Sequence, residues 1–177
     1  MLHGKLVNLR PYEMSDLDDI MEWINDSEIR PFLMMVLPIS RIQEIEFLQQ
    51  RLCKPTNEDI ILAIETKDGI YLGGIGLHRI NYFDCHAEVG IVIGKKEYRG
   101  KGYGTDAMLT VLNYAFNQLN LHKVYLHVYS FNKRGIRSYE KCGFKREGLL
   151  KEHVFKKGKY HDVLRMGILK KEFRKLK

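Results

Sequence analysis

The stretch Arg99-Gly100-Lys101-Gly102-Tyr103-Gly104 decides the fold, because it lies between a predicted strand and the clearest predicted helix of the chain. Backbone N–H groups converge at the start of a helix, where the helix dipole also favours an anion. Three glycines at alternate positions carry no Cβ, so a pyrophosphate can approach the backbone closely, and Arg99 and Lys101 add positive charge. The stretch therefore predicts a phosphate-binding loop.

Two common nucleotide-binding motifs do not fit this loop. A Walker A motif needs Ser or Thr after its Gly-Lys pair, but here the pair is followed by Gly102. A dinucleotide fingerprint that starts at Gly100 needs a last glycine where Thr105 stands. The pattern that does fit is R-x-x-G-x-G, with Arg99, Gly102 and Gly104 at its fixed positions.

Hydrophobic periodicity on both sides of the loop predicts strands mixed with helices. Apolar residues from Met108 to Leu119 recur at helical spacing, and residues 87–94 alternate as expected for a strand. The other predicted strands are 6–10, 59–65, 70–78, 123–129, 144–155 and 160–169. The other predicted helices are 16–25 with Ser15 as N-cap, 41–52 with a Ser40/Gln43 capping box, and a short helix capped by Asn132 that ends near Cys142. Hairpins and strand-helix-strand units occur together, so we expect one α/β domain over residues 1–177, with a mixed sheet and helices on both faces.

The sequence also indicates where in the cell the protein is expected. No stretch has the roughly 20 apolar residues that a membrane span needs, and residues 1–10 lack the apolar core of a signal peptide. We therefore expect a cytoplasmic protein with no membrane partner. Cys53, Cys85 and Cys142 form no C-x-x-C pair, which argues against a disulfide framework and against a zinc site.

Charge is divided unevenly along the chain. Residues 1–94 hold 8 Lys and Arg against 15 Asp and Glu, whereas residues 95–177 hold 21 against 7. The basic half suits a polyanion, which includes nucleic acid, a phosphate-rich cofactor and a membrane surface, and the acidic half suits a cationic ligand.

A second motif follows the loop. The segment Asn132-Lys-Arg-Gly-Ile136-Arg-Ser-Tyr139-Glu-Lys-Cys-Gly143-Phe144 resembles the N-x-x-(small)-I-x-x-Y-x-(K/R)-x-G-F segment of the GNAT superfamily of N-acetyltransferases. The R-x-x-G-x-G pattern resembles the loop with which that family grips the pyrophosphate of coenzyme A. The two motifs agree in order and spacing, and the predicted strand order also matches, so the resemblance covers essentially the whole chain.

This resemblance implies a fold and a reaction. The fold is that of the acyl-CoA N-acyltransferases, with a central twisted mixed sheet of about seven strands. The reaction is direct attack of a primary amine on acetyl-CoA, bound as co-substrate in a ternary complex without a metal. The pantetheine arm would lie between diverging strands, and an N–H near Val92 or Ile93 would polarise the thioester carbonyl. The implied cofactor-binding residues are Ile91, Val92, Ile93, Arg99, Gly100, Lys101, Gly102, Tyr103, Gly104, Thr105, Asn132, Ile136, Tyr139 and Lys141.

Two catalytic roles follow from the same resemblance. Tyr139 is the implied general acid for the departing thiolate, and the alternative is a core aromatic residue with a satisfied hydroxyl. Glu88, at the start of the strand before the loop, is the implied general base. The alternative is that Glu88 is only an exposed strand carboxylate and that a water relay serves as the base. Tyr82, His86 and His127 are weaker alternatives for the base.

The acceptor is narrowed to cationic amines. Within the superfamily, Leu6-Val-Asn-Leu-Arg-Pro and the segments 147–152, 157–160 and 164–166 resemble the branch of RimJ/RimL-type ribosomal-protein N-terminal acetyltransferases and bacterial spermidine acetyltransferases. The apolar loop 32–37 carries no carboxylate for a second ammonium. We therefore expect a peptide N-terminus or a small amine, with a spermidine-type polyamine as the alternative.

Two other classes of function compete with the enzyme. The basic second half and its tyrosines suit a nucleic-acid-binding module, but no helix-turn-helix and no RNP-like strand is present in the sequence, so we do not expect nucleic acid as a partner. The second competing class is a module that binds coenzyme A without catalysing a reaction. A homodimer is compatible with the sequence.

Overall fold

The computed structural model describes residues 1–33, 38–52 and 57–175. In this part of the chain the strands form one eight-stranded sheet in the order β1-β2-β3-β4-β5-β6-β8-β7. The strands are β1 (Leu2–His3), β2 (Val7–Arg10), β3 (Ile60–Thr66), β4 (Tyr71–Asn81), β5 (His86–Ile93), β6 (Lys123–Tyr129), β7 (Lys145–Lys156) and β8 (Lys159–Leu169). The helices are α1 (Leu17–Ile24), α2 (Arg41–Leu52), α3 (Tyr103–Asn117), α4 (Lys133–Lys141) and α5 (Lys170–Phe173), with short 3-10 helices η1 (Met14–Asp16), η2 (Arg30–Phe32) and η3 (Lys96–Tyr98). None of the helices so described is long and apolar enough to cross a membrane.

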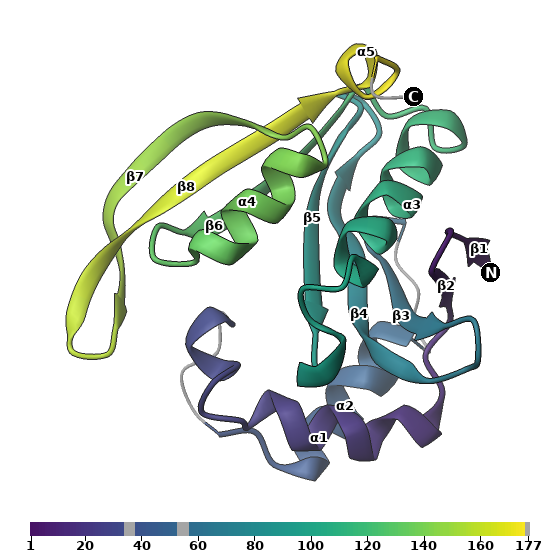
Figure 1. Ribbon diagram of the computed structural model, residues 1–177, viewed down its shortest axis with the longest axis vertical. Coiled ribbons are helices and arrows are strands. Elements are labelled where there is room, and N and C mark those ends of the chain that lie inside the picture. Colours follow the sequence, from purple (N-terminus) through teal and green to yellow (C-terminus); the bar gives the residue numbers. More distant parts are fainter. Residues whose placement is uncertain (34–37, 53–56, 176–177) are drawn as a thin grey trace.

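The sheet is antiparallel except between β5 and β6, which run parallel. These two strands pair only from His86–Glu88 to Lys123–Tyr125. Further along, β5 stays paired with β4 as far as Ile93, whereas β6 stays paired with β8 as far as Tyr129. The two strands therefore diverge, and Figure 1 shows the β7–β8 hairpin swinging away from the lower end of β5.

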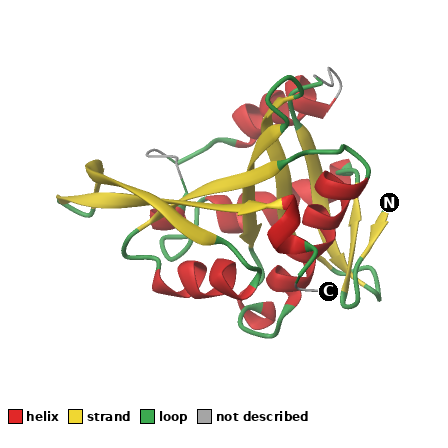
Figure 2. Ribbon diagram, turned by 90° about the horizontal axis from the view of Figure 1, so that it is seen from above, coloured by secondary structure: helices red, strands yellow, loops and turns green. Residues whose placement is uncertain are grey.

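Helices cover both faces of the sheet, as predicted (Figure 2). The larger core lies under α3 and α4, where Met108 and Phe116 pack with Leu126 of β6. The smaller core lies under α1 and α2, where Trp23 packs against Tyr71 of β4 with ring centroids 5.3 Å apart. The sheet thus forms the middle of three layers, and the opening between β5 and β6 connects its two faces.

Most predicted elements are confirmed, with corrections at their ends. The capping box of α2 is present: the Ser40 N–H donates to Gln43 Oε1 at 2.9 Å, and the Gln43 N–H donates to Ser40 Oγ at 3.3 Å. The Ser15 cap is wrong, because η1 precedes α1 and it is the Asp16 carboxylate that accepts the Glu13 N–H at 2.9 Å. β1 and α5 were not predicted, because they are too short to show periodicity.

A buried ion-pair network fixes the start of α1 to the sheet. Arg10, at the end of β2, donates two hydrogen bonds to Asp16 at 2.7 and 2.8 Å and one to Glu65 of β3 at 2.6 Å. The Asp16 side chain is only 3% exposed. Breaking a buried pair leaves an uncompensated charge, so this network is costly to disturb.

Asp16→Asn is therefore expected to lower the free energy of unfolding by about 2–4 kcal/mol, because it leaves the Arg10 guanidinium without its main counter-charge. Urea denaturation monitored by circular dichroism measures this loss. The matched control is Asp18→Asn on the same helix, since the Asp18 side chain is 82% exposed in its pair with Arg41. The control should change stability by less than about 0.5 kcal/mol, and equal effects of the two substitutions would contradict the account.

Candidate functional site

The divergence of β5 and β6 opens a cavity of about 1340 Å³ that passes between the two strands. Side chains and backbone from β4, β5, β6, α4 and the β7–β8 hairpin line it, together with the segment around η2. Unpaired strand backbone at this opening, which would otherwise have continued the ladder, can bind an extended ligand as an added strand would.

The glycine loop lies at one end of the cavity. Gly100 and Gly102 have φ angles of +77° and +94°, which favour glycine, and Gly102 is the N-cap of α3. Gly104 and Thr105, in the first turn of α3, also line the cavity. This combines free N–H groups and the positive end of a helix dipole in one place, as an anion needs.

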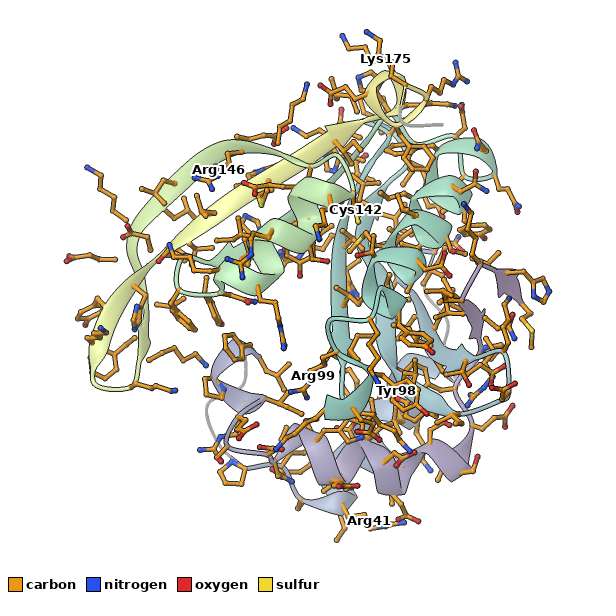
Figure 3. All side chains as sticks on the ribbon, viewed as in Figure 1. Arg41, Tyr98, Arg99, Cys142, Arg146 and Lys175 are labelled. Carbon is orange, nitrogen blue, oxygen red and sulfur yellow. The ribbon has the colours of Figure 1, made fainter. Side chains whose placement is uncertain are left out.

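Arg99 has a structural role as well as a place in the cavity. Its Nε donates to the Ile93 carbonyl at 2.9 Å and another guanidinium nitrogen donates to the Gly94 carbonyl at 2.6 Å. Figure 3 shows Arg99 beside the end of β5, below α4 in this view. Burial lowers the pKa of Arg99, and the nearby Arg134 adds to this shift. The side chain thus holds the end of β5 while contributing positive charge to the cavity.

Two further cations on this side were not among the predicted site residues. Arg134 and Arg137 line the cavity with Lys141, and all three come from α4. Their spacing of three and four residues places them on one helix face, which is a signal that the sequence analysis did not use. The Asn132 cap of this helix is confirmed, since Asn132 Oδ1 accepts the Gly135 N–H at 2.9 Å.

The opposite side of the cavity is acidic. Three carboxylate side chains line it there, those of Glu58, Asp59 and Glu88. The fourth lining carboxylate, Glu28, instead pairs with Lys96 near Arg99. Only Glu88 was among the predicted site residues, because Glu58 and Asp59 stand just before β3 with no motif around them. Phe32 and Leu33 of the apolar loop also line the cavity, whereas residues 34–37 of that loop lie outside the described part of the chain.

Glu88 has two side-chain partners. Its Oε2 accepts a hydrogen bond from Arg79 at 2.8 Å, and its Oε1 lies 2.7 Å from Nδ1 of His127 on β6. The Glu88 side chain is 18% exposed. Both carboxylate oxygens are therefore engaged at the point where β5 and β6 begin to diverge.

Tyr139 lines the cavity from α4 and packs on Phe144 with ring centroids 6.1 Å apart. Burial raises the pKa of the Tyr139 phenol to about 12, and the Cys142 thiol adds to this shift. The phenol therefore keeps its proton throughout the physiological pH range and is available as a donor. It is also part of the core edge, so the two alternatives from the sequence are compatible.

Not every implied cofactor residue reaches the cavity. Ile91, Val92 and Ile93 line it along β5, but Ile136 is 3% exposed within the larger core, where it holds α4 on the sheet. Lys101 and Tyr103 are absent from the lining, and the Tyr103 ring instead packs on Tyr98 at 5.3 Å.

Of the three weaker candidates for the base, one lines the cavity and two do not. His127 lies in the cavity lining, whereas Tyr82 and His86 are not part of it. Tyr82 is 50% exposed in the turn after β4, and the His86 ring packs on Tyr125 with centroids 5.8 Å apart.

Comparisons with known proteins agree with this arrangement. A model of the acetyltransferase (GNAT) domain family matches residues 7–145. A spermidine N(1)-acetyltransferase of Vibrio cholerae is 35% identical over 167 residues, covering 94% of this chain and 95% of that protein. The spermidine N(1)-acetyltransferase of Escherichia coli is 32% identical over 167 residues, covering 94% of this chain and 88% of that protein. The crystal structure of spermidine N-acetyltransferase from Vibrio cholerae in complex with CoA and spermine matches with a TM-score of 0.88 and 33% identity, over 97% of this chain and 99% of that one.

If the glycine loop binds the pyrophosphate, Gly102→Ala should weaken coenzyme A binding about tenfold, or about 1.4 kcal/mol, because a Cβ strains the backbone that presents the N–H groups. Isothermal titration calorimetry measures the affinity. Gly158→Ala, in the turn between β7 and β8, is the matched control, since Gly158 has a similar φ of +78° and does not line the cavity. An equal loss of affinity in both variants, or in neither, would contradict the role of the loop.

Proposed function

The chain belongs to the acetyltransferase (GNAT) family, and from this premise we propose that the amine it acetylates is a polyamine of the spermidine class. The donor is acetyl-CoA, which this family uses as co-substrate. The sequence alone favoured a peptide N-terminus or a small amine and left the polyamine as the alternative. The spermidine acetyltransferase relatives support the alternative, because they match nearly the whole chain. Family membership favours the enzyme over the nucleic-acid-binding module.

The division of charge within one cavity carries this proposal. Cations from the second half of the chain line the side next to the glycine loop: Arg99, Arg134, Arg137 and Lys141. Carboxylates from the first half line the other side, namely Glu58, Asp59 and Glu88, with Arg79 paired to Glu88. The first set suits the phosphates of coenzyme A, and the second set suits an acceptor with more than one positive charge.

A polyamine fits the acidic side better than a monoamine does. At neutral pH it carries several ammonium groups, and only the one that attacks has to lose its charge. For an amine with a pKa of about 10.4, that loss costs roughly 4.6 kcal/mol at pH 7. The ammonium groups that stay charged can meanwhile pair with carboxylates such as Glu58, which a monoamine cannot do. The apolar loop lacks a carboxylate, but these carboxylates reach the cavity from other segments.

Acetyl transfer needs four contributions from the chain. The strand backbone at Gly90 to Ile93 orients the thioester, because β5 has no strand partner on its β6 side there. Tyr139 donates to the sulfur as the C–S bond breaks, and the glycine loop anchors the phosphates. A base removes the proton from the attacking nitrogen, and Glu88 remains the sequence-based prediction for that role.

Glu58→Gln should raise the KM for spermidine about tenfold, since a charge-assisted contact contributes about 1.5 kcal/mol. Butylamine has only one amine, so its kcat/KM should stay unchanged. Steady-state assays of coenzyme A release with both amines measure the difference. The control is Glu97→Gln on η3, an exposed carboxylate that is not part of the cavity lining. Wild-type protein that uses butylamine as well as spermidine would contradict the polyamine proposal.

Tyr139→Phe should lower kcat several-fold and leave the affinity for acetyl-CoA unchanged, because it removes only the hydroxyl that acts on the departing sulfur. The raised pKa of about 12 adds a pH criterion. An acid must be protonated to act, so deprotonation of Tyr139 should cause no fall in wild-type kcat below about pH 11. An unchanged kcat in the variant would show that Tyr139 is only a core residue.

A further inference from the structure

A second histidine and carboxylate pair lies on the acidic side of the cavity. Nδ1 of His78 on β4 is 3.2 Å from Oδ1 of Asp59, and both residues line the cavity. The His78 side chain is 37% exposed and the Asp59 side chain 17%. An ionised carboxylate only accepts hydrogen bonds, so this contact requires a proton on Nδ1 and leaves the lone pair on Nε2.

Two glycines make room for the His78 ring. Gly76 of β4 and Gly90 of β5 are register partners, and the ring lies over both of them. A Cβ at Gly76 would lie 2.7 Å from Nε2 of His78, and a Cβ at Gly90 would lie 3.7 Å from it. Any other residue at Gly76 would displace the ring. The position of the His78 ring therefore accounts for the glycine at this point of β4.

The ring also points to the place where the sheet opens. Gly90 is two residues beyond Glu88, the last residue of β5 that pairs with β6. His78 is the register partner of Glu88 across β4 and β5, so Nε2 reaches from β4 toward the first opened part of β5. By contrast, the two oxygens of Glu88 are already engaged by Arg79 and His127.

We infer that His78 is the general base of the reaction and that Asp59 is its positioning residue. This inference rests on acetyl transfer to an amine and holds for whichever amine is the acceptor. An imidazole is the side chain best matched to proton transfer near neutral pH. Asp59 fixes the ring with Nε2 directed into the cavity and stabilises the imidazolium that forms, as a carboxylate does for a histidine base in acyl transfer.

The proton balance follows from these positions. The ammonium of the acceptor first releases one proton to water. As its nitrogen forms the C–N bond, the second proton passes to Nε2 of His78, and the electron pair of the C–S bond leaves with the sulfur. The sulfur takes a proton from the Tyr139 hydroxyl, which regains one from water. His78 finally releases its proton to solvent, so one turnover yields amide, thiol and one proton.

His78→Asn tests the base directly, because an Asn amide retains a donor for Asp59 but has no group at the position of Nε2. We expect kcat/KM to fall about 100-fold with spermidine and with butylamine. The part of the acid limb that is due to the enzyme should disappear, which leaves only the rise caused by deprotonation of the acceptor amine. Acetyl-CoA affinity and the melting temperature should stay unchanged. The control is His122→Asn, at an exposed histidine outside the cavity lining. A kcat/KM within about threefold of wild type, with its acid limb intact, would overturn the inference.

Two more variants separate a chemical role from a structural one. Imidazole added to His78→Ala should restore part of the lost rate, because the space over Gly76 and Gly90 is then empty. Asp59→Asn should move the acid limb to lower pH, since the imidazolium loses its adjacent negative charge. The other charged or titratable groups on this side of the cavity are Glu58 before β3, Glu88 on β5, Arg79 on β4 and His127 on β6. No rescue together with an unmoved limb would leave His78 a packing residue.

Glu88→Gln distinguishes the two candidates for the base. If His78 is the base, this variant keeps the acid limb of the pH profile, whereas loss of the limb assigns the proton to Glu88. The identity of the acceptor is read separately, from the preference of the wild-type protein for spermidine over butylamine. Failure of the polyamine proposal therefore leaves the test of His78 intact.

Discussion

The parallel pairing of β5 with β6 is the constraint on which the site depends, because it ends after Glu88 and Tyr125. Each strand keeps its other neighbour: β5 follows β4, and β6 follows β8. One sheet thus becomes two diverging halves, held together by a short parallel ladder and by the core beneath α3. The cavity, the free edge of β5 and the access of both substrates to one point all follow from this divergence.

The same divergence brings the two oppositely charged halves of the chain together. The sequence showed an acidic half and a basic half but gave no reason for them to meet. In the fold, α4 and the glycine loop supply cations to one side of the opening, while the turn before β3 and the start of β5 supply carboxylates to the other. On the proposed function, each substrate would meet charge opposite to its own, and the reacting atoms would meet between the two sets.

Features that depend on local chemistry could be predicted from the sequence. The α2 capping box, the Asn132 cap and the glycine loop are each fixed by a few neighbouring residues, and the structure has all three. Ser15 failed as a cap because the buried pair of Asp16 with Arg10 decides how α1 begins. Ile136 was assigned to the cofactor by its motif, although packing places it in the core.

Residues that meet only through strand register were out of reach of the sequence. His78 and Asp59 lie 19 positions apart, and the contact depends on the register of β3, β4 and β5. The clue available in advance was the alternation of Gly76 and His78 on one face of a predicted strand. It becomes informative only when Gly90 is known to lie opposite.

A crystal structure of the chain with a bisubstrate analogue, in which coenzyme A is joined through an acetyl bridge to spermidine, tests the central claim most directly. The account predicts phosphates on the loop 99–104, the bridge beside Gly90 between β5 and β6, and the polyamine arm extending toward Glu58 and Asp59. An analogue bound outside the opening, or a polyamine arm directed away from these carboxylates, would contradict it.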